Sequence, residues 1–263
     1  MPAVPWKPTR ICRKWQKKSS NGVSEMADYS DLSYESLGEG YKICVSQEHR
    51  FGTDAFLLAD FASPRHKDRV CDLCTGDGIV ALLMSRDFKP KEIYAVELQE
   101  KAYHQLCLSR EASSAVEIVP VNADLKEWQA PYQFDVITCN PPYKIDNTGA
   151  KNDSEAVSIA RHEIACTVYD VCKAAKKMLK FGGRLCICNR PERLADCIEA
   201  MRQNGIEPKR LRTVHKDTKT DAWLILLEGS MGGAKFMKVL PPLIVKGENG
   251  EAYSDEMKRI YKL

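Results

Sequence analysis

Short apolar segments alternate with amphipathic segments from residue 69 to residue 188. Short runs rich in β-branched and aromatic residues predict strands, and apolar positions three and four residues apart predict helices. Strands that alternate with helices form βαβ units, so the pattern predicts a mainly parallel sheet covered on both faces. The expected strands are 69–73, 93–96, 115–121, 135–139 and 184–188, and the expected helices are 79–86, 101–109 and 168–179.

The pattern changes towards the carboxyl terminus. The strand-like runs 210–213 and 222–227 are separated only by a polar loop. A parallel crossover needs about a dozen residues, so these two strands must pair antiparallel. The sequence therefore predicts a doubly wound α/β fold, a mainly parallel, seven-stranded, Rossmann-like sheet with an antiparallel edge strand. Gly182 and Gly183 follow the last predicted helix and are expected to cap its carboxyl end.

Three regions are expected along the chain. A basic extension over 1–32 carries lysines and arginines interleaved with Trp6 and Trp15, which is typical either of nucleic-acid contact or of a solvated tail. Met26 is an alternative start of the protein. The principal domain covers 33–250 and begins with a short hairpin or loop and a buried helix that ends near Pro64. A tail or helix over 251–263 follows.

The composition is that of an ordinary globular protein, with 44% hydrophobic and 29% charged residues and a net charge of +3. No apolar run reaches the roughly 20 residues of a membrane span, and no apolar signal segment follows the basic amino terminus. The 11 cysteines include several in strand-like runs, which favours free thiols in a reducing cytoplasm. Cys71 and Cys74 have no second pair at ligand spacing, so no metal site is expected. The oligomeric state stays open, with a monomer favoured.

Acidic side chains follow the ends of three successive predicted strands. Asp72 precedes a turn with Gly76 and Gly78, which let the backbone approach a ligand closely. Glu97 stands 19 residues after Gly78, where a carboxylate accepts hydrogen bonds from ribose hydroxyls. Asp124 ends the third strand and is a candidate acceptor for the amino group of adenine. So many carboxylates repel a pyrophosphate, so S-adenosyl-L-methionine, with its positive sulfonium, fits better than NAD. The product is then S-adenosylhomocysteine.

The tetrapeptide N-P-P-Y, at 140–143, follows the fourth predicted strand. Consecutive prolines exclude a helix and leave backbone carbonyls without ladder partners. An amino group on a base is a poor nucleophile because its lone pair is conjugated with the ring. If Asn140 Oδ1 and the Pro141 carbonyl each accept one amino hydrogen, the lone pair is directed at the methyl group. Tyr143 is expected to stack on the base. The loop and the acidic set together predict an amino-methyltransferase.

The sequence resembles class I S-adenosylmethionine-dependent methyltransferases of the N-P-P-Y type. It is most similar to bacterial tRNA1(Val) (adenine-N6)-methyltransferases, which modify the adenosine next to the anticodon of valine tRNA. The resemblance spans about residues 35–245 and rests on these segments: R-F-G-T-D-A at 50–55, D-L-C-T-G-D-G at 72–78, Glu97, N-A-D at 122–124, N-P-P-Y at 140–143 and R-H-E at 161–163.

The resemblance implies that Phe51, Thr53 and Asp54 lie over the methionine end of the cofactor. The chain departs from the family pattern at Cys74, the position where the family usually has the first glycine of the turn. This departure is expected to weaken cofactor binding at most. The expected catalytic residues are Asn140, Pro141, Pro142 and Tyr143. The expected cofactor-binding residues are Phe51, Thr53, Asp54, Asp72, Cys74, Gly76, Gly78, Glu97, Asp124 and Asn140.

Several functions stay open beside N6-methylation of adenosine 37 in valine tRNA. The same loop chemistry serves N5-methylation of glutamine in release factors and N2-methylation of guanine in ribosomal RNA. A non-catalytic RNA-binding module on this scaffold is an alternative of another class. His162 and Glu163 belong either to a lid over the base or to a helix start. With tRNA as the expected partner, the candidate phosphate contacts are Lys209, Arg210, Arg212, Lys216 and Lys219.

Overall fold

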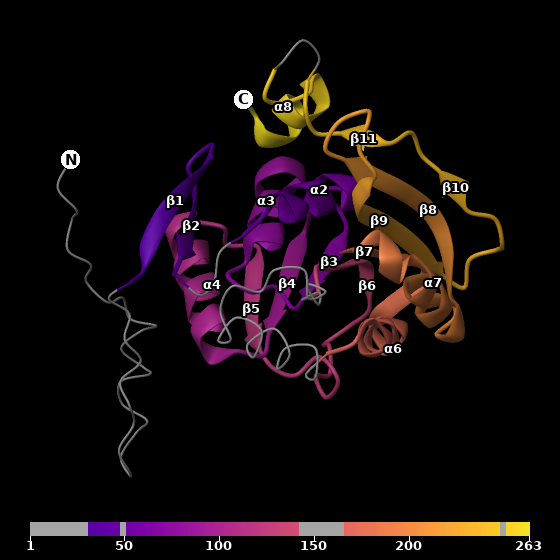
Figure 1. Cartoon of the computed structure of the whole chain (residues 1–263). Coiled ribbons are helices and arrows are strands. Elements are labelled where there is room, and N and C mark those ends of the chain that lie inside the picture. Colours follow the sequence, from indigo (N-terminus) through magenta and orange to yellow (C-terminus); the bar gives the residue numbers. More distant parts are fainter. Residues whose placement is uncertain (1–30, 48–50, 142–165, 248–250) are drawn as a thin grey trace, which may run out of the picture. The chain divides into compact units, whose positions relative to one another are not determined.

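One compact unit spans Leu32–Leu263. The computed structural model describes residues 31–47, 51–141, 166–247 and 251–263 (Figure 1). The described part is built around a sheet in the order β10-β8-β9-β7-β6-β3-β4-β5, with β11 also paired to β8. Its strands are β3 (Arg69–Leu73), β4 (Glu92–Glu97), β5 (Ile118–Asn122), β6 (Phe134–Cys139), β7 (Leu179–Asn189), β8 (Ile206–His215), β9 (Ala222–Met231), β10 (Lys238–Val239) and β11 (Leu243–Ile244).

The predicted fold class is confirmed. All seven predicted strands are present, and β3 has the predicted bounds to the residue. Strands β5, β4, β3, β6 and β7 are parallel, whereas β9 runs antiparallel to both β7 and β8. The two-residue strands β10 and β11 extend the edge by pairing with β8, and they were not predicted because two residues carry no periodicity.

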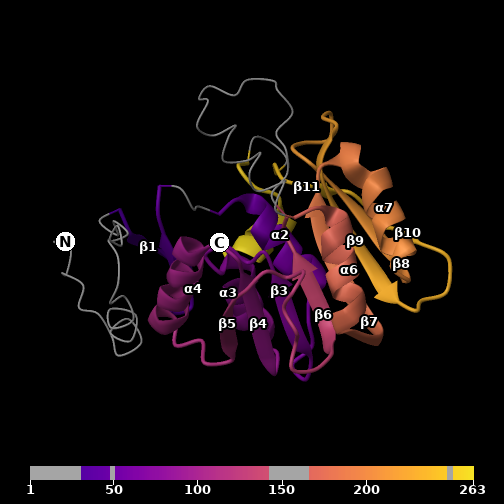
Figure 2. The same cartoon turned by 90° about the horizontal axis from the view of Figure 1, so that it is seen from below.

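Helices cover both faces of the sheet because side chains alternate between the faces along each strand. Val70 and Val136 belong to the core beneath α2, α3 and α4, whereas Cys71 and Ile137 belong to the core beneath α6 and α7. Figure 2 shows α6 and α7 along the β7, β9 and β8 side of the sheet. The helix bounds are α2 (Thr53–Ala62), α3 (Ile79–Phe88), α4 (Glu100–Ala112), α6 (Val168–Met178), α7 (Leu194–Gln203) and α8 (Asp255–Tyr261), with a short 3-10 helix η1 (Pro191–Arg193).

The predicted glycine cap after α6 is wrong. The helix passes directly into β7 at Leu179, which is extended and whose N–H donates to the Ala175 carbonyl. Gly182 and Gly183 lie inside β7, where the pairing with β6 shifts register. A Cβ on Gly183 would lie 2.9 Å from the Lys180 carbonyl oxygen, so the second glycine permits a close backbone approach within the strand.

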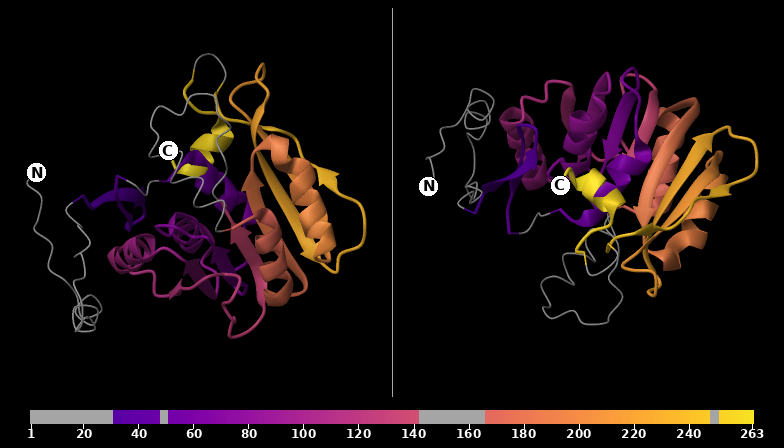
Figure 3. Two further views of the ribbon diagram at one scale, coloured as in Figure 1. Left: turned by 60° about the horizontal axis from the view of Figure 1, so that its bottom comes forward. Right: turned by 90° about the horizontal axis from the view of Figure 1, so that it is seen from above.

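Two small elements complete the fold. The hairpin of β1 (Ser33–Gly38) and β2 (Tyr41–Val45) confirms the turn expected over this stretch, and β2 is fastened to α4 by a hydrogen bond from the Cys44 N–H to Ser109 Oγ. Helix α8 lies beside α2 (Figure 3), where the Tyr261 hydroxyl donates to Thr53 Oγ1 over 2.8 Å. This hydrogen bond connects the start of α2 to a helix that is not part of the sheet's βαβ units.

The other end of α2 is fixed by an ion-pair cluster around a buried carboxylate. Glu228 on β9 accepts hydrogen bonds from Arg184 over 2.8 Å and from Arg210 over 2.6 Å. The same two guanidinium groups donate to the carbonyls of Ala62 and Phe61 at the end of α2. The cluster thus joins α2 to three neighbouring strands.

Replacement of this carboxylate is expected to destabilise the protein. Glu228→Gln leaves two arginines against an uncharged side chain in a buried setting, and we expect a loss of about 2 kcal/mol in the free energy of unfolding. Urea unfolding checks the value, with Glu127→Gln at an exposed position as the control. Equal stability of the two variants would contradict the role assigned to the cluster.

The order of the strands creates a switch point in the sheet. The chain builds β3, β4 and β5 outwards in one direction, and β6 then returns to the opposite side of β3. Open α/β sheets bind ligands beyond the carboxyl ends of the strands at such a point. We therefore expect a ligand site among the residues that follow β3 and β6. Among the described helices, none is long and apolar enough to cross a membrane.

Candidate active site

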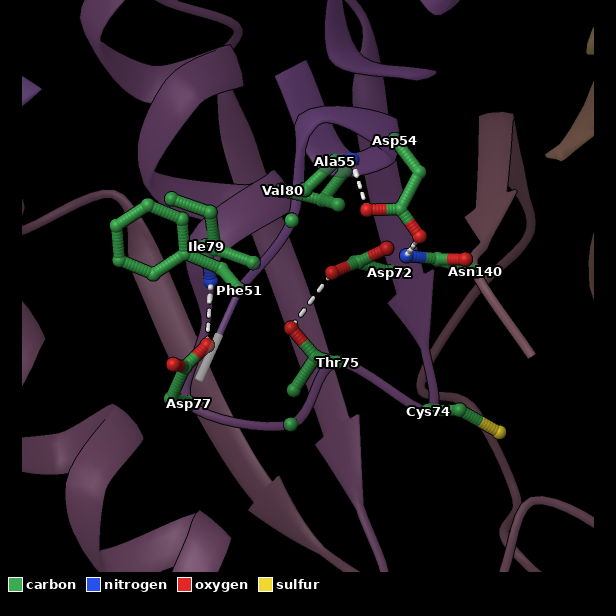
Figure 4. Close-up of a pocket in the computed structure, with 12 residues that line it drawn as sticks. Phe51, Asp54, Ala55, Asp72, Cys74, Thr75, Asp77, Ile79, Val80 and Asn140 are labelled. Carbon is green, nitrogen blue, oxygen red and sulfur yellow. Dashed lines mark hydrogen bonds between the residues drawn. The ribbon is translucent and has the colours of Figure 1, made fainter. Parts of the chain in front are cut away.

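A cavity of about 220 Å³ lies at the switch point (Figure 4). Its wall combines the start of α2, the carboxyl end of β3 with the turn into α3, and the residue that follows β6. The lining residues are Phe51, Gly52, Asp54, Ala55, Asp72, Cys74, Thr75, Gly76, Asp77, Ile79, Val80 and Asn140. Asn140 therefore lies in the same cavity wall as the turn, although the two are more than 60 residues apart in the sequence.

The turn from β3 to α3 uses left-handed backbone conformations. Cys74, Gly76 and Gly78 have φ angles of 54°, 61° and 91°. A Cβ on Gly78 would lie 2.5 Å from Leu106 Cδ1 on α4, so glycine is required there for both conformation and space. Cys74 adopts the same region without being glycine, which costs about 1–2 kcal/mol. Its Sγ lies 4.0 Å from that of Cys166.

Glu97 fixes the turn from the neighbouring strand. This buried carboxylate ends β4 and accepts a hydrogen bond from the Gly76 N–H at Oε2 and from the Gln99 N–H at Oε1, each over 2.8 Å. The Asn122 side chain donates to the Glu97 carbonyl over 2.9 Å, which connects the end of β5 to the end of β4. Backbone and carboxylate are therefore both held in place beside the turn.

Asp72 is a buried carboxylate at the floor of the cavity. It accepts hydrogen bonds from the hydroxyls of Thr75 and Thr138, each over 2.6 Å. Burial raises the pKa of Asp72 to about 6, and the two threonine hydroxyls oppose this rise. The carboxylate is thus oriented by two donors but has no cationic partner among them.

Asp77 is a second buried carboxylate in the turn. Its Oδ1 accepts a hydrogen bond from the Ile79 N–H over 3.3 Å, while Oδ2 is buried without a hydrogen-bond partner. Burial raises the pKa of Asp77 to about 7. A buried carboxylate oxygen without a hydrogen-bond partner is costly when the group is ionised.

This cost predicts an unusual pH dependence of stability. The pKa of Asp77 is higher in the folded than in the unfolded chain, so stability contributed by its protonation is lost as the pH rises from about 4 to about 7. Asp77→Asn removes the buried charge, and we expect the variant to exceed the wild type by about 1–2 kcal/mol at pH 8 and by less at pH 5.

Melting temperatures at both pH values test this prediction. The control is Asp135→Asn: burial opposes ionisation there, but the Lys180 hydrogen bond prevails and lowers the pKa of Asp135. That variant is expected to lose stability rather than gain it, and by about the same amount at pH 5 and at pH 8, because both values lie above the pKa of this carboxyl in the folded and the unfolded chain. A gain from Asp77→Asn that is the same at both pH values would contradict the account.

Asn140 is held between two elements as the chain leaves β6. Its Nδ2 donates to Asp54 Oδ2 at the start of α2, and its Oδ1 accepts from the Cys188 thiol on β7, each over 3.0 Å. Figure 4 shows the Asp54 and Asn140 side chains facing each other beside Asp72. The amide is therefore oriented before any ligand arrives.

The predicted site residues fall into three groups. The cavity wall includes Phe51, Asp54, Asp72, Cys74, Gly76 and Asn140. Five others stand outside it: Thr53, Gly78, Glu97, Asp124 and Pro141. Asp124 accepts a hydrogen bond from the Lys126 N–H over 2.9 Å at the end of β5. Pro142, Tyr143, His162 and Glu163 lie outside the described residues.

Sequence reasoning missed two residues that shape the site. Asp77 lies in the turn motif at 72–78, and an acidic side chain between two glycines of such a turn is a signal for a further carboxylate at the site. Cys188 ends the predicted strand 184–188, and no local pattern relates it to Asn140, 48 residues away. Gly52, Ala55, Ile79 and Val80 complete the wall through backbone and apolar atoms.

The five basic residues considered for phosphate contact differ in their surroundings. Lys209 donates to three loop carbonyls, those of residues 234–236. Arg210 binds Glu228, and Arg212 binds Glu256. Lys216 and Lys219 are exposed in the turn between β8 and β9, which follows the carboxyl end of β8. These two lysines are therefore the stronger candidates for phosphate contact at this edge of the sheet.

Comparison with known proteins decides the family. Residues 46–205 match the family model described as methyltransferase small domain. The chain belongs to this family. It is accordingly a methyltransferase, and the alternative of a non-catalytic RNA-binding module is set aside.

Relatives and a solved structure agree with the family. The methyltransferase is 26% identical over 179 residues to the tRNA1(Val) (adenine(37)-N6)-methyltransferase of Glaesserella parasuis serovar 5 (strain SH0165), covering 62% of this chain and 74% of the relative. It is 34% identical over 140 residues to the Bacteroides thetaiotaomicron protein of the same name, covering 52% of this chain and 58% of the relative. A crystal structure of a predicted O-methyltransferase from Agrobacterium tumefaciens superposes with a TM-score of 0.65 at 19% identity, covering 80% of this chain and 96% of that one, which supports the fold.

Proposed function

We propose that this methyltransferase transfers the methyl group of S-adenosyl-L-methionine to N6 of an adenosine in tRNA, at position 37 next to the anticodon of valine tRNA. The single observation that carries the proposal is the presence of Asn140 in the wall of the cavity formed by Asp72 and the turn. The names of the relatives from Glaesserella parasuis and Bacteroides thetaiotaomicron support the choice of tRNA and of adenine.

The donor set of the cavity fits S-adenosylmethionine. This cofactor carries an ammonium group and a sulfonium, and the cavity offers two buried carboxylates whose pKa values burial has raised towards neutrality. The carboxylate of Asp77, which lines the cavity and whose Oδ2 has no hydrogen-bond partner, is proposed to favour a cationic group there electrostatically. Glu97 is proposed to hold the ribose, Asp124 the adenine amino group, and Phe51 and Asp54 the methionine end. When bound, the cofactor supplies an electrophilic methyl group.

The residues of this chain then act on the substrate amine. Asn140 Oδ1 and the Pro141 carbonyl are proposed to accept its two hydrogens, which reduces conjugation with the ring and directs the nitrogen lone pair. The new N–CH₃ bond forms as the S–CH₃ bond breaks, and the nitrogen afterwards releases one proton to solvent. Both oxygens stabilise the positive charge that develops on nitrogen. The base must leave the tRNA stack to reach them.

The phosphate contacts are proposed to come from the carboxyl edge of the sheet. Lys216 and Lys219 lie in the turn after β8 and are exposed. A basic turn on this edge would bind the backbone on either side of an extruded base without reading its sequence.

A pair of transcripts tests the assigned nucleotide. Valine tRNA made without modifications is offered with adenosine or with guanosine at position 37, and methyl incorporation from labelled S-adenosylmethionine is measured. We expect incorporation into the adenosine transcript only. Equal incorporation into both transcripts would place the reaction at another nucleotide, and incorporation only into the guanosine transcript would overturn the choice of adenine.

A further inference from the structure

We propose that Asp54 and Cys188 are positioning residues that together fix the orientation of the Asn140 amide, so that Oδ1 rather than Nδ2 is presented to the substrate amine. The proposal rests on the proposed function in one respect, because it takes Asn140 as the group that receives the amine. It assigns Asp54 a role beyond cofactor binding and gives Cys188 its first role in the site.

Asp54 determines where the amide nitrogen lies. Its Oδ1 accepts the Ala55 N–H over 3.0 Å, which anchors the carboxylate in the first turn of α2. Its Oδ2 lies 3.0 Å from Asn140 Nδ2. An ionised carboxylate has only acceptors, so it pairs with the NH₂ end of an amide and repels the oxygen end. The carboxylate thus selects one of the two amide orientations.

Cys188 determines where the amide oxygen lies. The thiol is fully buried in β7, and its Sγ lies 3.0 Å from Asn140 Oδ1. The thiol donates to the amide oxygen only when the amide is in the orientation that Asp54 also selects. An amide oxygen can accept two hydrogen bonds, so this contact does not by itself exhaust Oδ1. The two residues therefore act on opposite ends of the same amide and favour the same state.

The consequence for catalysis follows from the donors and acceptors. An amine with its lone pair directed at a methyl group presents two N–H donors, and only the oxygen of Asn140 can accept one of them. A rotated amide would present its own N–H groups and disfavour the productive complex. Loss of either contact should therefore lower kcat even when the cofactor is saturating, because the orientation of the amide is affected.

Substitutions at the thiol provide the sharpest test. Cys188→Ala is expected to lower kcat about tenfold and to leave the Kd for S-adenosylmethionine within about twofold of the wild type. Cys188→Ser keeps a donor and should recover kcat to within about threefold. Cys186→Ala is the matched control, because that thiol is also buried, lies two residues earlier in β7 and contacts Glu228 instead. Equal kcat values for the two alanine variants would overturn the proposal.

Substitutions at Asp54 separate orientation from cofactor binding. Asp54→Ala should raise the Kd for S-adenosylmethionine, since the residue is also proposed to hold the methionine end, and should in addition lower kcat at saturating cofactor at least tenfold. Asp54→Asn should recover part of kcat because its amide oxygen can still accept from Nδ2. A rise in Kd that accounts for the whole loss of activity would overturn the positioning role and leave Asp54 as a cofactor-binding residue alone.

A spectroscopic measurement keeps this proposal separate from the proposed function. The side-chain amide of Asn140 is observed by NMR in asparagine-labelled protein without tRNA or cofactor. We expect slow exchange of its N–H protons in the wild type and in Cys186→Ala, and faster exchange in Asp54→Ala and Cys188→Ala. If these signals behave as expected but no tRNA is methylated, the proposed function fails and the positioning stands. Signals that are identical in all four proteins would overturn the positioning, whatever the substrate.

Discussion

Asn140→Ala is expected to lower kcat for methyl transfer about 10³-fold while the Kd for S-adenosylmethionine stays within about threefold of the wild type. The amide is proposed to act only on the substrate amine, as an acceptor for the charge that develops in the transition state. Its removal leaves the turn, Glu97 and Asp72 in place, and these are the groups proposed to hold the cofactor. Single-turnover kinetics with tRNA and calorimetric titration with the cofactor measure the two quantities.

The control for this variant is Asn189→Ala. Asn189 ends the neighbouring strand β7, is buried, and does not line the cavity. It is expected to change kcat by less than about threefold once its folded fraction is taken into account. A parallel loss of cofactor affinity in Asn140→Ala would show that the residue serves binding rather than methyl transfer.

Glu97→Ala is expected to weaken S-adenosylmethionine binding about 100-fold. The carboxylate accepts the Gly76 and Gln99 N–H groups and is proposed to accept the ribose hydroxyls as well. Hydrogen bonds to a charged acceptor contribute about 1.5–3 kcal/mol each, and about 2.8 kcal/mol corresponds to 100-fold in Kd. Once the cofactor is saturating, kcat should recover to within about fivefold, since Asn140 is unchanged.

Glu92→Ala is the matched control for Glu97. Glu92 is a glutamate at the opposite end of β4, where it pairs with Arg69 over 2.7 Å. Its loss affects stability but does not touch the cavity, so the Kd for the cofactor should stay within about twofold. Equal weakening by the two variants would mean that strand β4, and not the carboxylate at its end, determines affinity.

The fold could be predicted from the sequence because its signals are local. The segment Arg69–Leu73 reads as a buried strand, and Gly76 and Gly78 mark the turn that follows it. The polar loop between β8 and β9 required antiparallel pairing. Gly182 and Gly183 were misread because glycine serves both a helix cap and a bulged strand, and only the pairing of β6 with β7 distinguishes the two.

The candidate site was predictable only in part. Asp72 and Asn140 could be expected to meet, since the strands that carry them end at a switch point. The contacts that orient Asn140 could not be predicted, because Asp54 lies 86 residues before it and Cys188 lies 48 residues after it. The unpartnered oxygen of Asp77 depends on burial in three dimensions, which no spacing in the sequence records.

The measurement that tests the central claim most directly is the identity of the methylated product. The protein is incubated with S-adenosylmethionine labelled on its methyl group and with unmodified tRNA, and in a parallel tube with a release factor; each product is digested and analysed by mass spectrometry. The account predicts labelled N6-methyladenosine from the tRNA, and none of it with Asn140→Ala. Label on a release-factor glutamine, label on another nucleoside, or no label from a protein that binds the cofactor would contradict it.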